Sequence, residues 1–121
     1  MYKFGPLFLL LLITACATPK PAPSSFEDAE QAIEAAVEIG AEEHSPVELR
    51  FAREKLAEAR KGMEHKSYEK AIYLIEQSEI NSELAIAKTK AAIARGKVTE
   101  AARQNEIMRE DFETTFGERF K

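Results

Sequence analysis

The chain has 121 residues, of which 31% are charged, and a formal net charge of −4. This length allows one domain at most, and the mildly acidic balance, without a broad cluster of Lys and Arg, argues against a nucleic-acid partner. Alanine recurs from Ala29 to Ala102 and tryptophan is absent, a composition typical of an all-α protein.

The first fifteen residues have the pattern of a secretory signal peptide. Lys3 supplies a positive charge, residues 4–13 are almost wholly apolar, and small residues precede Cys16. The apolar run has about half of the ~20 residues that a membrane-spanning helix needs. We therefore expect residues 1–15 to be removed by cleavage between Ala15 and Cys16.

Cys16 is the single cysteine, so a disulfide within one chain is excluded, and residues 17–25 offer no metal ligands beside it. The stretch Ile13-Thr14-Ala15-Cys16 resembles the bacterial lipobox. This resemblance implies that Cys16 is acylated and anchors the protein in a membrane, since several acyl chains hold a protein there stably. Ala17 after the cysteine implies sorting to the outer membrane, facing the periplasm. The alternative is an ordinary cleaved signal with an incidental cysteine.

Residues 16–25 are the expected lipidated N-terminus and linker. They contain three prolines within five residues, in the stretch TPKPAPSS from Thr18 to Ser25. Such a sequence favours an extended spacer of ~3 Å per residue. We expect it to hold the folded part off the lipid surface.

Two helices are predicted after the linker. Ser25 can cap the first, over residues 26–43, and Ser45-Pro46 begins the second with proline at the favoured first position. The second ends near Gly62 and His65. Apolar or small residues follow at alternating spacings of three and four: Phe26, Ala29, Ile33, Ala36 and Gly40 in the first, then Leu49, Ala52, Leu56, Ala59 and Met63 in the second.

A third helix is predicted from Tyr68 to about Thr114, with two stripes on nearly opposite faces. The first stripe is Tyr68, Ala71, Ile75, Ser78, Ser82 and Ala85. The second stripe is Ile80, Leu84, Ala87, Ala91, Ala94, Val98, Ala101, Asn105, Met108 and Phe112. The long helix should therefore pack against one element early and another later.

Two arrangements of this helical domain, residues 26–116, follow from the stripes. We favour a long antiparallel hairpin whose first arm is kinked at Ser45-Pro46, because it sets the seven acids of the first helix opposite the five bases of residues 84–103. The alternative is a compact three-helix bundle with a protruding C-terminal helix. Its second stripe would form a homodimer in which Asn105 fixes the register. Residues 117–121 form a tail in both.

Three short motifs resemble an uncharacterised helical family of bacterial envelope lipoproteins. They are Ser45-Pro46-Val47-Glu48-Leu49, Ala52-Arg53-Glu54-Lys55-Leu56 and Tyr68-Glu69-Lys70-Ala71. Ser45 departs from the family, in which alanine usually precedes the proline. The resemblance covers about residues 26–100 and implies a short helical lipoprotein, often encoded beside peptidoglycan-binding outer-membrane proteins.

Residues that could carry chemistry are sparse. His44 and His65 fall at the helix junctions, and Glu110, Asp111 and Glu113 crowd into one turn with nothing nearby to desolvate them. Phosphate loops, nucleophile elbows and His-x-x-x-His pairs are missing from the sequence. We expect no enzyme, no catalytic residue, no metal site and no cofactor.

The C-terminal part offers candidate contacts instead. Aromatic and apolar side chains that suit a partner surface are Val98, Met108, Phe112, Phe116 and Phe120. The final Arg119-Phe120-Lys121 resembles the end of the murein lipoprotein, which implies covalent attachment of Lys121 to peptidoglycan.

The sequence thus predicts a non-enzymatic outer-membrane lipoprotein that acts as a periplasmic helical spacer or adaptor for another envelope component, either a protein or peptidoglycan. One alternative is a structural tether to the cell wall through Lys121. Another is a peptide-binding module with a groove between its helices.

Overall fold

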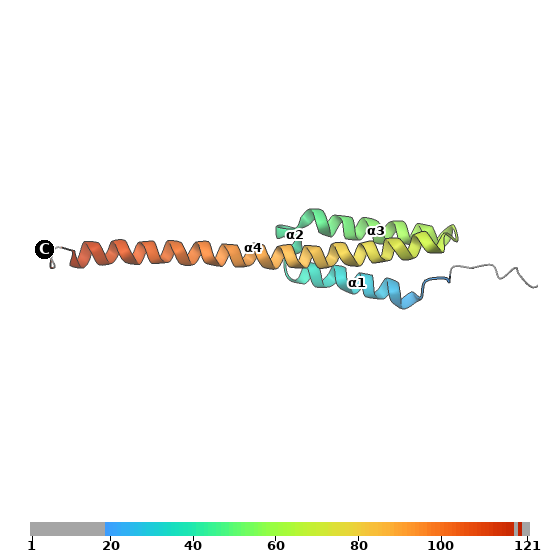
Figure 1. Ribbon diagram of the computed structural model, residues 1–121, viewed down its shortest axis with the longest axis horizontal. Coiled ribbons are helices and arrows are strands. Elements are labelled where there is room, and N and C mark those ends of the chain that lie inside the picture. The colour runs from blue at the N-terminus through green and yellow to red at the C-terminus, as the bar shows by residue number, and fades with distance from the viewer. Residues whose placement is uncertain (1–18, 118, 120–121) are drawn as a thin grey trace, which may run out of the picture.

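The computed structural model describes residues 19–117 and 119, and over this range the fold is all-α, as predicted. The helices are α1 (Pro23–Glu38), α2 (Ala41–His44), α3 (Pro46–Glu64) and α4 (Tyr68–Phe116). The first three helices and the beginning of α4 lie together at one end of a long rod, and α4 continues alone to the other end (Figure 1). Both helices predicted after Ser45 are confirmed, α4 ending two residues beyond Thr114.

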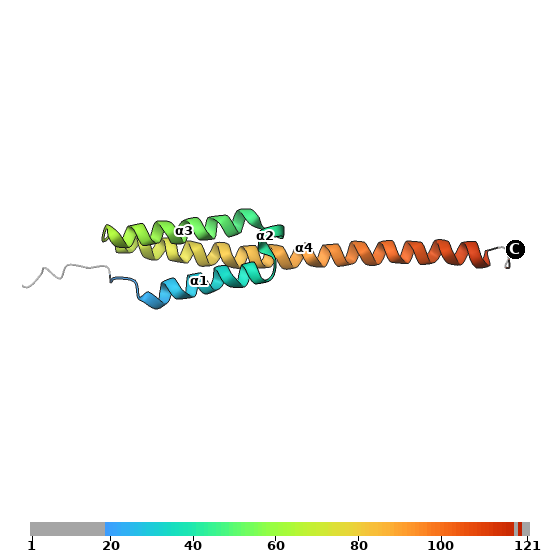
Figure 2. The same ribbon diagram turned by 180° about the vertical axis from the view of Figure 1, so that it is seen from behind.

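The favoured hairpin is wrong, and the alternative bundle with a protruding helix is correct. In a hairpin, α1 would lie along the distal half of α4, but it folds back along the proximal half, on the other side of α4 from α3 in these views (Figures 1 and 2). Ala29 of α1 shares a core cluster with Leu56 of α3 and Leu74 of α4. The bundle therefore contains three helices side by side.

A sharp turn at Gly40 causes this reversal. Residues 26–43 were predicted as one helix, but α1 ends at Glu38, and Gly40 adopts a left-handed φ of 91° before α2 begins. Glycine reaches this conformation without the steric cost of a Cβ atom. Ala36 and Ala41, on either side of the turn, pack with Leu49 and Ala85. Gly40 thus forms the turn and does not extend the apolar stripe.

The folded region begins earlier than the predicted boundary at residue 26. Ala22, and not Ser25, stands at the N-cap of α1, with Pro23 in the first helical turn, where proline is favoured. Pro21 is buried. The last residues of the predicted spacer therefore belong to the packed domain.

Small side chains let α3 and α4 approach closely. The buried core contains seven alanines, with Leu49, Leu56, Leu74 and Ile75 as its larger members. Gly62 on α3 faces Ala71 on α4, and a Cβ atom placed on Gly62 would lie 3.4 Å from the Ala71 Cβ. The resulting core is narrow, and it requires small side chains at these positions.

The first stripe of α4 is buried against this core, as predicted, and its polar members are hydrogen-bonded. Ser78 donates to the Ala52 carbonyl oxygen at 2.8 Å, and Ser82 donates to the Ser78 carbonyl oxygen at 3.0 Å. Thr89 donates to Ser45 Oγ at 3.3 Å. Thr89 is also the last buried residue of α4, so the bundle ends there.

Candidate functional site: the exposed half of α4

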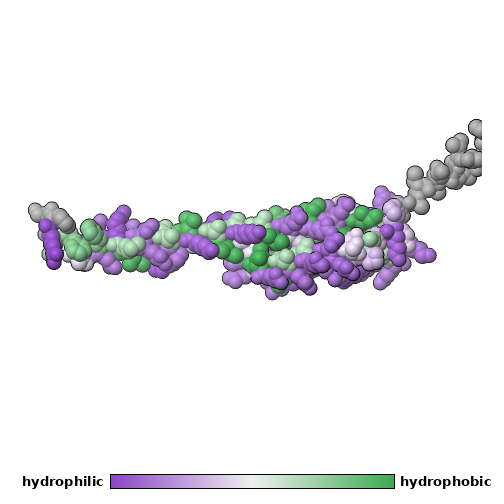
Figure 3. Space-filling view, turned by 90° about the horizontal axis from the view of Figure 1, so that it is seen from below, coloured by the Kyte–Doolittle hydropathy of each residue, from purple (hydrophilic) through white to green (hydrophobic). Residues whose placement is uncertain are grey.

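The part of α4 beyond the bundle is a solvent-exposed single helix. Every residue from Ala94 to Phe116 is exposed, including large apolar side chains: Val98 is 70% exposed, Met108 62% and Phe112 57%. We call residues 94–116 the distal half. Apolar side chains lie between charged ones along this arm on the face seen in Figure 3. An apolar series of this length is typical of an interaction surface.

The second stripe of α4 runs through the distal half with the spacing of a coiled coil. From Ile80 to Phe112 its members alternate between steps of four and three residues, an average of 3.5, which keeps one face toward a partner helix. The stripe is also open beside the bundle, where Ile80 is 54% and Leu84 43% exposed. The second stripe is therefore a continuous, uncovered seam.

Four of the five predicted contact residues lie in this half, and Phe120 lies outside the described residues. Val98, Met108 and Phe112 are on the second stripe, as the sequence predicted. Phe116 lies beside Phe112, with ring centroids 5.2 Å apart, and the Arg119 guanidinium stands 5.7 Å from the Phe116 ring centre. The end of α4 thus carries an aromatic pair that one partner could contact.

Ion pairs within α4 support the distal half locally. Glu100 binds Arg103 at 2.8 Å, and Arg109 binds Glu106 at 3.0 Å and Glu113 at 4.0 Å. Hydrogen bonds from Arg103 and Gln104 lower the pKa of Glu100. Such exposed pairs stabilise a helix only slightly. The distal half therefore lacks the stabilisation that a packed apolar face would provide.

Charge is distributed unevenly along this arm. Residues 90–97 contain three bases and no acid, whereas residues 104–117 contain four acids and one base. Lys88, just before the basic segment, is already paired with Glu48 of α3. Between the two segments, Glu100 and Arg103 balance each other. The arm is therefore positive near the bundle and negative near its tip.

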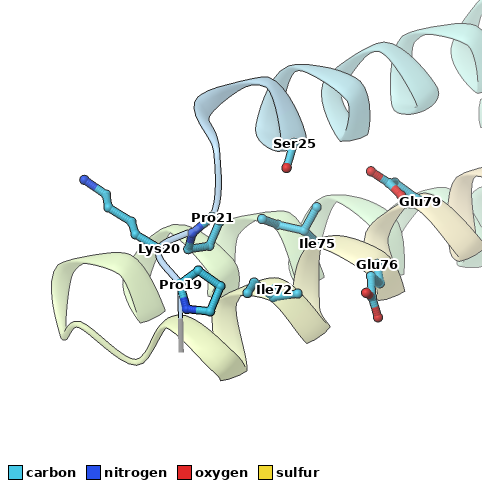
Figure 4. A pocket seen from close by; sticks show the side chains of 8 residues that line it. All are labelled: Pro19, Lys20, Pro21, Ser25, Ile72, Ile75, Glu76 and Glu79. Carbon is cyan, nitrogen blue, oxygen red and sulfur yellow. The ribbon is translucent and has the colours of Figure 1, made fainter. Parts of the chain in front are cut away.

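A second feature, which the sequence did not predict, is a hollow of about 340 Å³ where the linker meets α4. Pro19 and Pro21 face Ile72 and Ile75 across it, and Glu79 lies at its far side (Figure 4). Burial raises the pKa of Glu79, and the negative charges of Asp28, Glu76 and Glu83 add to this effect. The linker therefore enters the bundle beside this hollow.

The groove expected of a peptide-binding module has a shallow counterpart between α1 and α3. A hollow of about 290 Å³ there is lined by Ile33 and Leu56 and by charged residues. Glu30 accepts a hydrogen bond from Arg60 at its edge, so an ion pair already occupies part of its rim.

The remaining predicted residues divide into two groups. Ala15, Cys16 and Lys121 lie outside the described residues. His44 ends α2 and His65 follows α3, and both are exposed, as are the three acids of residues 110–113. Within residues 19–117 and 119, no set of three or more His, Cys, Asp or Glu residues is placed to hold a metal ion. In the same range, no helix is both long enough and apolar enough to span a membrane.

Comparison with known proteins identifies the class. Residues 24–101 match DUF4398, a domain of unknown function, and the chain belongs to this family. The match confirms the resemblance to an uncharacterised helical family, predicted over residues 26–100. No curated protein and no solved structure matches the chain. The matched range covers the bundle and stops at Ala101, so Asn105, Met108 and Phe112 lie beyond it.

Proposed function

We propose that this protein is a non-enzymatic lipoprotein of the bacterial outer membrane that holds a helical docking arm in the periplasm. Cys16 carries the lipid, the bundle is the base, and the distal half of α4 binds another envelope component. The observation that carries this proposal is the exposed second stripe at the end of the rod opposite the linker.

The geometry favours a spacer. Pro19, three residues after Cys16, borders the same hollow as Ile72 in the first turns of α4. Phe116 lies 44 residues beyond Ile72 on the same helix, which is about 65 Å at 1.5 Å per residue. A lipid at Cys16 would therefore lie at one end of the rod and the aromatic side chains at the other, up to about 65 Å apart along α4.

The side chains favour binding over catalysis. Acid–base chemistry needs titratable groups brought together in a concave, partly dry site. Along the distal half the carboxylates are exposed on one convex helix. The apolar series from Val98 to Phe112 is instead suited to packing against another helix.

The lipid anchor is tested by the mass of the mature protein. We expect the wild-type chain to begin at Cys16 and to be heavier than residues 16–121 by a diacylglycerol and an acyl chain. Cys16→Ser should lose this added mass, whereas Thr18→Ser, a matched change two residues away, should keep it. A wild-type mass equal to the unmodified chain, or a different first residue, would contradict the anchor.

The docking arm is tested by photocrosslinking in cells. A photoreactive residue in place of Val98 or Met108 should give a crosslinked product. The same residue in place of Tyr73, which is 59% exposed on the bundle, should give none. Equal crosslinking from all three positions would show that the distal half has no special role.

A further inference from the structure

We infer that the occupant of the exposed second stripe is a second copy of this chain, lying antiparallel, with the two α4 helices related by a two-fold axis near Arg103. The inference rests on the proposed function of the distal half as a docking surface and names a second copy of this chain as the component that it binds; it does not depend on the lipid anchor. Residue sizes, charges and the position of Asn105 support this pairing.

Beyond Leu84, the stripe carries small side chains near the bundle and large ones near the tip. Near the bundle its members are Ala87, Ala91 and Ala94, and near the tip they are Met108 and Phe112. Parallel helices would place the large side chains at the same level and leave the alanines facing each other across a gap. Antiparallel helices avoid both, because interiors pack best when large residues face small ones.

An axis at residue 103 gives a specific register. Phe112 then faces Ala94 of the second copy, and Met108 faces Val98. Each layer joins a larger side chain to a smaller one, and the overlap runs from about residue 91 to residue 115. It ends where Thr89 marks the edge of the bundle, so the bundles lie beyond the paired segment.

The charge distribution favours the same direction. Two parallel copies would set the three bases of residues 90–97 side by side, and likewise the acidic residues of the tip. Two antiparallel copies set the basic segment of each beside the acidic segment of the other. Like-charge contacts disfavour a register, and opposite charges help to select it.

The flanking residues show this in detail. Lys97 comes beside Asp111 of the second copy on one flank, twice by symmetry. On the other flank Arg95 meets Arg109, whose charge is balanced by ion pairs with Glu106 and Glu113 of its own helix. The two Lys97–Asp111 contacts are therefore the charge contacts that favour this register.

Asn105 is accommodated near the axis. In this register it faces Ala101 of the second copy, and the two Asn105 side chains lie in adjacent layers. The small alanines leave room for the amides to bond to each other or to water. A polar residue within such a seam selects one register.

The resulting dimer has one bundle at each end. Each Tyr68 lies 35 residues from the axis, so the two ends of the dimer are about 105 Å apart at 1.5 Å per residue. The two linkers leave from opposite ends. An antiparallel dimer therefore differs from a parallel one in its overall shape as well as in its contacts.

Disulfide trapping tests the direction. The full chain carries Cys16→Ser so that each introduced thiol is the sole one, and chains of different mass with Val98→Cys or Met108→Cys are mixed. We expect a disulfide between a Val98→Cys chain and a Met108→Cys chain. Two chains that carry the same substitution should form none. In the antiparallel dimer identical positions are about 15 Å apart along the axis, beyond the ~7 Å limit for bridged Cα atoms.

The matched control is Thr99→Cys mixed with Ile107→Cys, which stand at matching levels but off the stripe, and these should not crosslink. Disulfides mainly between identical chains would overturn the inference in favour of a parallel pair. A monomer by sedimentation at tens of micromolar would overturn it as well, while partner capture from position 98 would still support the docking function.

A charge exchange tests the register. Lys97→Asp should weaken the dimer roughly two- to thirtyfold, because it replaces two exposed ion pairs by repulsion. Adding Asp111→Lys to the same chain should restore the wild-type dissociation constant. In a parallel pair Lys97 faces Ala102, so failure of the double variant to recover would contradict the antiparallel register.

Discussion

The two halves of α4 share one helix and one kind of sequence, yet they differ completely in burial. In the proximal half, residues 68–89, Leu74 is 4% and Ile75 3% exposed, whereas in the distal half Met108 is 62% and Phe112 57% exposed. Both halves carry an alanine-rich stripe with a spacing of three and four. Hydropathy alone therefore does not decide which half is covered.

The turn at Gly40 makes the difference. It directs α1 back along the proximal half, where Ala29 and Ala36 are fully buried. If the chain before Ser45 continued along the axis of α3 without this turn, α1 would lie along the distal half instead. One backbone conformation thus divides α4 into a structural half and a half free to bind.

The largest contrast is expected from removing a large apolar side chain in each half. Leu74→Ala should lower the free energy of unfolding by about 2–5 kcal/mol, because it leaves a cavity in the core. Met108→Ala should change it by less than about 0.5 kcal/mol in dilute protein, since the side chain is exposed. Urea unfolding followed by circular dichroism measures both. Equal losses would mean that the distal half is packed within the monomer.

Glycine substitutions should change stability in opposite directions in the two regions. Gly40→Ala should cost about 1 kcal/mol, because φ is 91° there and a Cβ atom disfavours the left-handed region. Gly96→Ala, where nothing lies within 4 Å of the added Cβ, should stabilise the distal helix by up to about 1 kcal/mol. Thermal unfolding of the bundle and helix content near melting report these separately. A neutral Gly40→Ala would show that the turn does not determine where α1 packs.

Helix positions were predictable from the sequence because their signals are local. Ser45-Pro46 begins α3, and the first stripe from Ala71 to Ala85 marks the buried face of α4. The packing of α1 was not predictable from charge, since exposed ion pairs are weak and bases are present on both possible neighbours. Glu30 pairs with Arg60 of α3 and not with the bases of α4.

The turn at Gly40 was not predictable for a different reason. The position of Gly40 continues the three and four spacing from Phe26, so it fits a helix stripe and a turn equally well.

For the site, the second stripe was predictable from its period, as were Val98, Met108 and Phe112. The hollow beside Ile72 was not, because it depends on Pro21 packing against α4, a contact between segments some fifty residues apart.

The smallest contrast concerns two carboxylates with lowered pKa values. The pKa of Glu48 is lowered mainly by a hydrogen bond from Lys88. This bond joins α3 to α4 at the edge of the bundle, and the Glu48 side chain is 14% exposed. A pKa that is lower in the folded state than in the unfolded one stabilises the fold at pH values above the unfolded pKa. That stabilisation is lost as the pH falls through the folded value.

Glu48→Gln should therefore reduce the stability of the bundle at pH 7 by no more than about 1 kcal/mol, and wild type and variant should converge as the pH falls well below 4.5, the ordinary carboxyl value. Glu100→Gln is the matched change in the distal half, because Arg103 and Gln104 lower that pKa within one helix. It should leave the urea midpoint of the bundle unchanged at both pH values. A shift of the urea midpoint caused by Glu100→Gln would mean that the two halves of α4 unfold as one unit. The covered half and the binding half would then not be independent in stability.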